Sequence, residues 1–87
     1  MKSQHPTQVR VAVYLGRNGW RWRIKRVRNW KVIGASTQGY ARRIDALDNL
    51  DLLTGISLES QDIEWPRNRP RIDFIAKLSH RWWAGPL

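Results

Sequence analysis

Cations and aromatic side chains alternate over residues 19–31, which read GWRWRIKRVRNWK and contain no acidic residue. Arginine and lysine bind phosphate groups, and an arginine guanidinium also matches the acceptor edge of guanine in the major groove of DNA. An aromatic ring among such cations offers a face on which a base can stack. The stretch therefore points to contact with nucleic acid, and the side of the chain that each residue occupies decides which ones are candidates.

A predicted β-hairpin places these residues. Val and Leu alternate with Arg10, Ala12 and Tyr14 over residues 9–15, and Trp and Ile alternate with Arg and Lys over residues 20–25. Asn18-Gly19 lies between the two runs, and this dipeptide between alternating runs is the strongest short-range signal for a hairpin. With these two residues as the loop, Leu15 pairs with Trp22, and a four-residue loop leaves the same faces together. The face predicted to enter the core carries Val11, Val13, Leu15, Trp20, Trp22 and Ile24.

The opposite face of the hairpin is basic, and we expect it to be the binding surface. Its guanidinium and ammonium groups are suited to phosphates, whereas the alternative is a solvated face without a ligand. Tyr14 is expected either to stack on a base or to shield Arg23 by cross-strand packing. The candidates on this face are Arg10, Tyr14, Arg21, Arg23 and Lys25.

Cations outside the two strands would widen this surface. Arg42 and Arg43 lie in the first turn of a predicted helix, where the helix dipole disfavours positive charge. A bound phosphate would offset that cost, and tolerance of a small penalty is the alternative. The candidates in the turns are Arg17, Arg26, Arg28 and Lys31.

One more strand and one helix complete the predicted domain. A third strand is expected from residue 30 to about residue 36, with two alternatives for its core-facing side, Trp30 with Val32 or Ile33 with Ala35. A helix is predicted over residues 40–53, ending at Gly55. Its apolar stripe should cover the sheet and consists of Tyr40, Ile44, Leu47 and Leu50. The predicted fold class is α+β, a three-stranded antiparallel sheet with one helix packed on one face, over residues 9–55.

Residues 56–87 are expected to pack as an extension on this domain or on a second subunit. Residues 56–58 fit a fourth strand, and WPRNRP at residues 65–70 predicts a turn or rigid connector. Residues 70–83 are predicted as a second helix that begins with proline, in preference to a strand with alternating Ile72, Phe74, Ala76 and Leu78. The closing Arg81-Trp82-Trp83 is expected to support a homodimer through the C-terminal segment.

Positive charge is concentrated in the first half of the chain. The formal net charge of the 87 residues is +9, with eleven Lys or Arg and no acid in residues 1–43, against five basic and seven acidic residues in residues 44–87. Such asymmetry favours an acidic partner, with nucleic acid first and an anionic membrane surface second.

Several other classes of protein are disfavoured. The chain has no cysteine, so disulfides and thiolate metal sites are excluded, and we expect a cytoplasmic protein. No apolar run is long enough to span a membrane, and residues 1–8, taken as a flexible N-terminus, lack a signal-peptide core. His5 and His80 are far apart in sequence, and no nucleophile or phosphate-loop motif is present. We therefore expect no enzymatic activity, no metal and no cofactor.

Residues 20–53 carry a family resemblance. The segment VIGASTQGY at residues 32–40 follows an aromatic, alternating strand and a short turn, and precedes a helix. This order resembles the repeat of the YegP-like family of small uncharacterised proteins. The resemblance implies a strand-strand-strand-helix unit, which in that family occurs in tandem or pairs between subunits. It implies no activity or catalytic residue, and this chain departs from it in having one unit and a more basic sheet.

The order of elements also resembles, as an analogy, the three-stranded DNA-binding domains of plant ethylene-response factors and of integrase arm-binding modules. Those domains place an exposed sheet face in the major groove, which is wide enough for a two-stranded ribbon. The sequence thus predicts a nucleic-acid-binding protein whose basic sheet face contacts double-stranded DNA mainly through phosphates. The alternative is a protein-interaction module that docks an acidic protein partner.

Overall fold

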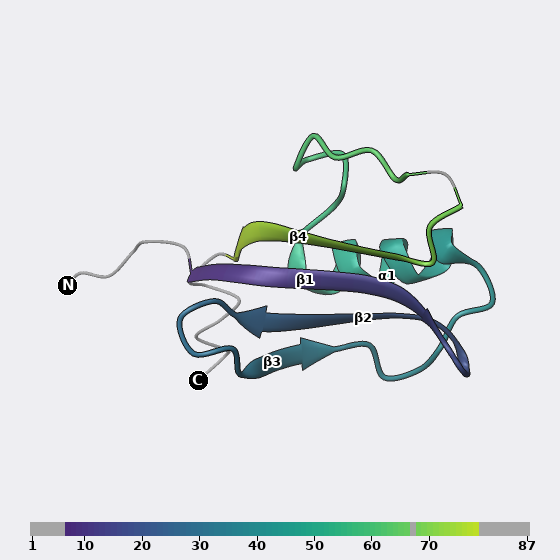
Figure 1. Ribbon diagram of the computed structural model, residues 1–87, viewed down its shortest axis with the longest axis horizontal. Coiled ribbons are helices and arrows are strands. Elements are labelled where there is room, and N and C mark those ends of the chain that lie inside the picture. The colour runs from purple at the N-terminus through teal and green to yellow at the C-terminus, as the bar shows by residue number, and fades with distance from the viewer. Residues whose placement is uncertain (1–6, 67, 79–87) are drawn as a thin grey trace.

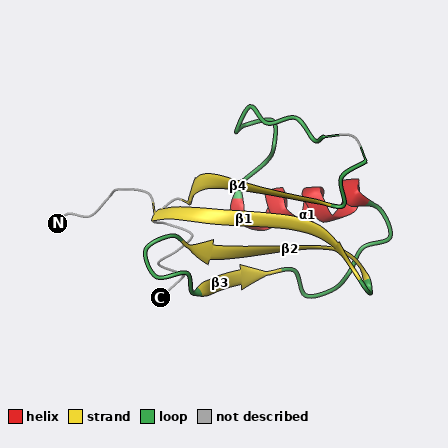
Figure 2. Cartoon of the chain, in the orientation of Figure 1, coloured by secondary structure: helices red, strands yellow, loops and turns green. Residues whose placement is uncertain are grey.

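The described part of the protein folds as one antiparallel sheet backed by one helix (Figures 1 and 2). The computed structural model describes residues 7–66 and 68–78. In chain order the elements are β1 (Thr7–Gly16), β2 (Gly19–Arg26), β3 (Val32–Ala35), α1 (Arg43–Thr54) and β4 (Arg71–Leu78). The α+β class with one helix on one face of an antiparallel sheet is confirmed.

The sheet has four strands in the order β3-β2-β1-β4, and not the three that were predicted. The preferred helix over residues 70–83 is wrong for its first part, because residues 71–78 form β4; residues 79–83 lie outside the described part of the chain. Tertiary pairing explains the difference. The edge of β1 that faces away from β2 would otherwise leave its backbone groups unpaired, and β4 covers it in full register from Tyr14–Arg71 to Thr7–Leu78.

The β1–β2 hairpin has the predicted faces but a different register. The loop consists of Arg17 and Asn18, with Gly16 opposite Gly19 and Leu15 opposite Trp20, so the predicted pairing of Leu15 with Trp22 is wrong by two residues. A shift of two residues keeps every side chain on its own face. Gly19 has φ 118°, and a Cβ atom there would lie 2.7 Å from the carbonyl oxygen of Tyr40.

Residues from far along the chain fix this turn. Tyr40 pairs with Trp20 through two backbone hydrogen bonds, from Trp20 N to Tyr40 O at 2.7 Å and from Tyr40 N to Trp20 O at 2.9 Å.

Leu15 lies next to the turn at the end of the sheet and is 51% exposed, so its predicted place in the core is wrong. Trp20 is only partly buried.

The core lies between the sheet and α1. Its buried members are Val9, Val11, Val13, Trp22, Ile24, Leu50, Ile56, Phe74, Ala76 and Leu78. Trp22 ties the layers together, because its indole Nε1 donates to the side-chain oxygen of Asn49 on α1 at 2.9 Å. The Trp22 backbone exchanges hydrogen bonds with Ser36, which anchors the end of β3.

Helix α1 is shorter than predicted and differs in its buried side. It begins at Arg43 instead of residue 40, and Ala46 and Leu50 are its buried residues. Ile44, assigned to the core stripe, is 51% exposed, because the sheet lies against the Ala46–Leu50 side. The predicted end is confirmed: Gly55 adopts φ 78° and its N–H donates to Asp51 O at 2.7 Å, which closes the helix.

The connections adjoining β3 and β4 are irregular. A register shift in the β2–β3 pairing separates Gly34, opposite Ile24, from Val32, opposite Lys25. The residue between them, Ile33, packs against the core, while Val32 is exposed. Residues 55–66 and 68–70 belong to no helix or strand, so the strand predicted at residues 56–58 does not form, although Ile56 is buried.

The described part of the chain contains no helix that could span a membrane. Over residues 7–66 and 68–78, no helix combines the length and the apolar character needed to cross a bilayer.

Candidate nucleic-acid interface

The sheet surface opposite α1, which we call the front face, brings most of the predicted cations together. The register places three cross-strand rows on it, namely Arg21–Tyr14–Arg71, Arg23–Ala12–Asp73 and Lys25–Arg10–Ile75. Lys77 lies on the same side of β4, beside Gln8. The strand residues of this face thus include six cations, Arg10, Arg21, Arg23, Lys25, Arg71 and Lys77.

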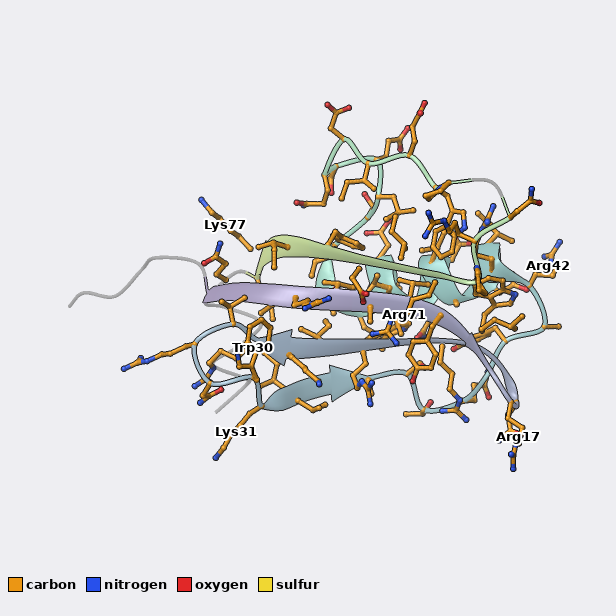
Figure 3. The ribbon with its side chains drawn as sticks, in the orientation of Figure 1. Arg17, Trp30, Lys31, Arg42, Arg71 and Lys77 are labelled. Atoms are coloured by element: carbon orange, nitrogen blue, oxygen red, sulfur yellow. The ribbon has the colours of Figure 1, made fainter. Side chains whose placement is uncertain are left out.

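Strand β4 adds residues to the front face that were not predicted as site residues. Arg71, Asp73 and Lys77 were assigned to a helix, whereas the strand directs them to the front face with Ile75. The signal that could have found them is the alternation of Ile72, Phe74, Ala76 and Leu78, since the residues between them must then face outwards. Figure 3 shows Arg71 in front of the sheet and Lys77 at the far end of β4.

Tyr14 lies between two guanidinium groups. The Arg23 guanidinium carbon is 5.7 Å from the centroid of the Tyr14 ring, and that of Arg71 is 5.6 Å away. These distances fit cation–π contacts, which hold long side chains in place on an exposed sheet. The structure thus shows the cross-strand packing of Tyr14 with Arg23, and it adds Arg71 as a second neighbour.

Asp73 partly neutralises one side of the front face. Its carboxylate accepts hydrogen bonds from Arg71 Nε and Nη2 at 3.1 Å, and Arg10 Nη2 lies 3.5 Å from its Oδ2. The side-chain hydrogen bond to Asp73 raises the pKa of Arg71 above its ordinary value. Asp73 is the one acid on the described strands of this face, so the cations of β2 are the least compensated.

Trp30 extends the front face from the β2–β3 turn. It is 52% exposed, and the Arg10 guanidinium carbon lies 5.9 Å from the centroid of its ring system. The sequence pattern allows Trp30 to face either the core or the surface, and the structure places it outside the core. In Figure 3 its side chain lies in front of the sheet, at the end of β2 away from Arg17.

The predicted turn cations lie at the two ends of the face. Arg17 is exposed in the β1–β2 loop, and Lys31 is exposed in the β2–β3 turn at the other end (Figure 3). Arg28 is exposed in the same turn as Lys31. Arg26 is the last residue of β2, opposite Val9, and is therefore on the core-facing side of the sheet. It does not share a face with Lys25.

Arg42 and Arg43 are separated from the front face. Arg42 is the N-cap residue of α1, behind the sheet, and its Nε lies 3.2 Å from a carboxylate oxygen of Asp45 in the first turn. This hydrogen bond raises the pKa of Arg42 above its ordinary value. The Asp45 carboxylate also supplies the negative charge that the helix N-terminus favours. Arg43 stacks on Trp65, with its guanidinium carbon 4.6 Å from the ring centroid. Asp45 thus partly neutralises Arg42, and Trp65 packs against Arg43.

Metal ligands do not cluster in the described residues. Over residues 7–66 and 68–78, no group of three or more His, Cys, Asp or Glu side chains is arranged to hold a metal ion. His5 and His80 lie outside those residues. The front face instead offers arginine, lysine and aromatic groups, which suit phosphates and bases.

Comparisons with protein-family models, with curated proteins and with solved structures find no match for this chain. The resemblance to the YegP-like family therefore depends on the residue pattern over residues 20–53 alone, and the assignment of function depends on the chemistry of the front face.

Proposed function

We propose that this protein binds nucleic acid through the front face, with phosphate contacts supplying most of the affinity. The observation that carries the proposal is the concentration of Arg21, Arg23 and Lys25 on β2, next to Arg10 and Arg71. One carboxylate accompanies these five cations on the described strands. A surface of this sign attracts polyanions, and arginine and lysine side chains of this length reach phosphates readily.

Double-stranded DNA is the ligand we propose for the cationic rows. Duplex DNA carries about one negative charge per 1.7 Å of its axis, which is a dense array of charge for a basic sheet face to contact. Arg21, Arg23 and Lys25 span about 13 Å along β2, so these three cations can contact successive phosphates of one DNA strand. A protein surface would offer fewer charges over the same length.

Binding to a random-sequence duplex tests this proposal. We expect micromolar affinity by fluorescence anisotropy, with a steep loss between about 50 and 200 mM salt. The double variant R21Q/R23Q should weaken binding and reduce the salt slope by about 2, because each lost phosphate contact removes about 0.9. The matched control R42Q/R43Q loses the same charge behind the sheet and should leave the slope nearly unchanged.

The outcomes separate nucleic acid from the alternative partner class. Equal losses in the two double variants would mean that net charge, and not the front face, drives binding. Absence of binding at the lowest salt would contradict the proposal and favour an acidic protein partner, whose interface would depend on a few central residues instead of phosphate density.

A further inference from the structure

The β2–β3 turn is held rigidly by backbone and side-chain hydrogen bonds. Arg26 N donates to Lys31 O at 2.9 Å, and Trp30 N donates to Arg26 O at 2.6 Å. Lys31 N donates to the side-chain oxygen of Asn29 at 3.1 Å, and Val27 N donates to Gln8 O on β1 at 3.1 Å. The turn is therefore fixed to the sheet, and so is the backbone that carries the Trp30 side chain.

Trp30 adopts a backbone conformation that is unusual for a large residue. Its φ is 60°, in the left-handed region, where a side chain other than glycine or asparagine is strained. Strain of this kind persists where the surrounding structure imposes it and is concentrated at functional sites. Here the conformation holds an indole out of the core, while Ile33 three residues later packs into it.

Arg10 and Asp73 link the indole to the sheet. The Asp73 carboxylate lies 3.5 Å from Arg10, and the Arg10 guanidinium lies beside the Trp30 ring. Half of Trp30 stays exposed with this neighbour in place. Arg28 and Lys31 are exposed in the same turn, so an aromatic surface and several cations meet at one end of the front face.

We propose that Trp30 is a stacking site for an unpaired base, so that the preferred ligand is a duplex that continues into a single strand. This inference rests on the proposed function, and it adds a base contact to the phosphate contacts. Bases inside a duplex already stack on both sides and offer no free face to an indole. An unpaired base next to a duplex on the β2 cations can reach the turn at the end of the same strand.

Stacking on an aromatic side chain tolerates every base, because each base has a π-face. The site therefore predicts a preference for the single-stranded junction without a preference for sequence. The energy of one base–aromatic stack corresponds to about a 5- to 150-fold gain in affinity.

Three DNA ligands test this inference by anisotropy: a blunt duplex, the same duplex with a short single-stranded tail, and the duplex with an abasic tail of equal length. Tails at the 5′ and the 3′ ends are both used. The abasic tail keeps the added phosphates and removes the bases. The protein should bind the base-bearing tail about 5- to 150-fold more tightly than the abasic tail.

Two variants assign the gain to the indole. Trp30→Ala should bring the ratio of the affinities for the two tails to about one, whereas Trp30→Phe should keep most of the difference between them. The exposed position makes unfolding of either variant unexpected, and circular dichroism checks it. Equal affinities of the wild-type protein for the two tails, with normal binding of the blunt duplex, would overturn the inference and leave the proposed function standing. Failure to bind any of the three ligands would overturn both.

Discussion

Asp73 is predicted to weaken nucleic-acid binding, so Asp73→Asn should strengthen it. The asparagine keeps the size of the side chain and removes the negative charge that Arg71 and Arg10 now share. Two cations of the front face are thereby released towards a phosphate. The asparagine side chain still accepts one hydrogen bond from Arg71, so the strand conformation should be retained.

The size of the effect follows from Coulomb's law. A phosphate bound at about 8 Å from position 73 would be repelled by the carboxylate by about 0.5 kcal/mol at the permittivity of water and about 2 kcal/mol at an effective permittivity of 20. Removing the charge should therefore tighten duplex binding by about 2- to 30-fold at low salt. The salt slope should steepen by about 0.9, because one more counterion is released.

Duplex anisotropy across salt concentrations measures both quantities, with Asp51→Asn as the control. Asp51 is exposed on α1, behind the sheet, so its loss makes the same change in net charge away from the front face. Unchanged or weaker binding by Asp73→Asn would refute the assignment of phosphate contacts to this face. Equally tighter duplex binding by both variants would mean that net charge, and not the position of Asp73 on the front face, determines the effect.

Two further predictions concern the structure that positions the face. Asn49→Ala leaves the buried Trp22 Nε1 without its acceptor and should cost about 1 to 3 kcal/mol of unfolding free energy in denaturant titrations; an unchanged midpoint would mean that the bond between sheet and helix contributes nothing. Gly39→Ala brings a Cβ against the backbone carbonyl of Asn18 and should cost about 1 to 3 kcal/mol, lowering Tm by several degrees. Gly55→Ala meets no atom and should cost only about 1 kcal/mol of left-handed strain, so a larger loss there than at Gly39 would contradict this packing.

The faces of the hairpin could be predicted from the sequence, but its register could not. Period-two alternation decides which residues share a side, and Val11, Val13, Trp22 and Ile24 are buried as expected. Register depends on the loop, and here the backbone of Tyr40 fixes it by pairing with Trp20. No local pattern around residues 16–19 contains that contact.

The fourth strand illustrates a competition that local signals do not decide. Pro70 and the later apolar spacing favour a helix start, while the alternation over residues 72–78 favours a strand. The unpaired edge of β1 settles the matter, because pairing along eight residues satisfies backbone groups on both strands. The error also hid part of the candidate site, namely Arg71, Asp73 and Lys77.

Five candidates on the front face were predicted correctly as neighbours, since Arg10, Tyr14, Arg21, Arg23 and Lys25 depend only on alternation. Trp30 could not be placed in the same way. Its backbone is left-handed and is followed by a register shift in the β2–β3 pairing, and the alternation of residue types specifies neither feature. Arg42 and Arg43 were grouped with the basic face although the helix was correctly predicted on the other side of the sheet. Their contacts with Asp45 and Trp65 are what the sequence pattern did not reveal.

An NMR titration of the isotope-labelled protein with a blunt random-sequence duplex tests the central claim most directly. Binding through the front face predicts that the amide and side-chain signals of Arg21, Arg23 and Lys25 shift most, with smaller changes at Arg71. Signals from the exposed side of α1, such as those of Asp48 and Leu52, should stay in place. Shifts confined to α1, or no shifts at low salt, would contradict the assignment of this face to nucleic acid.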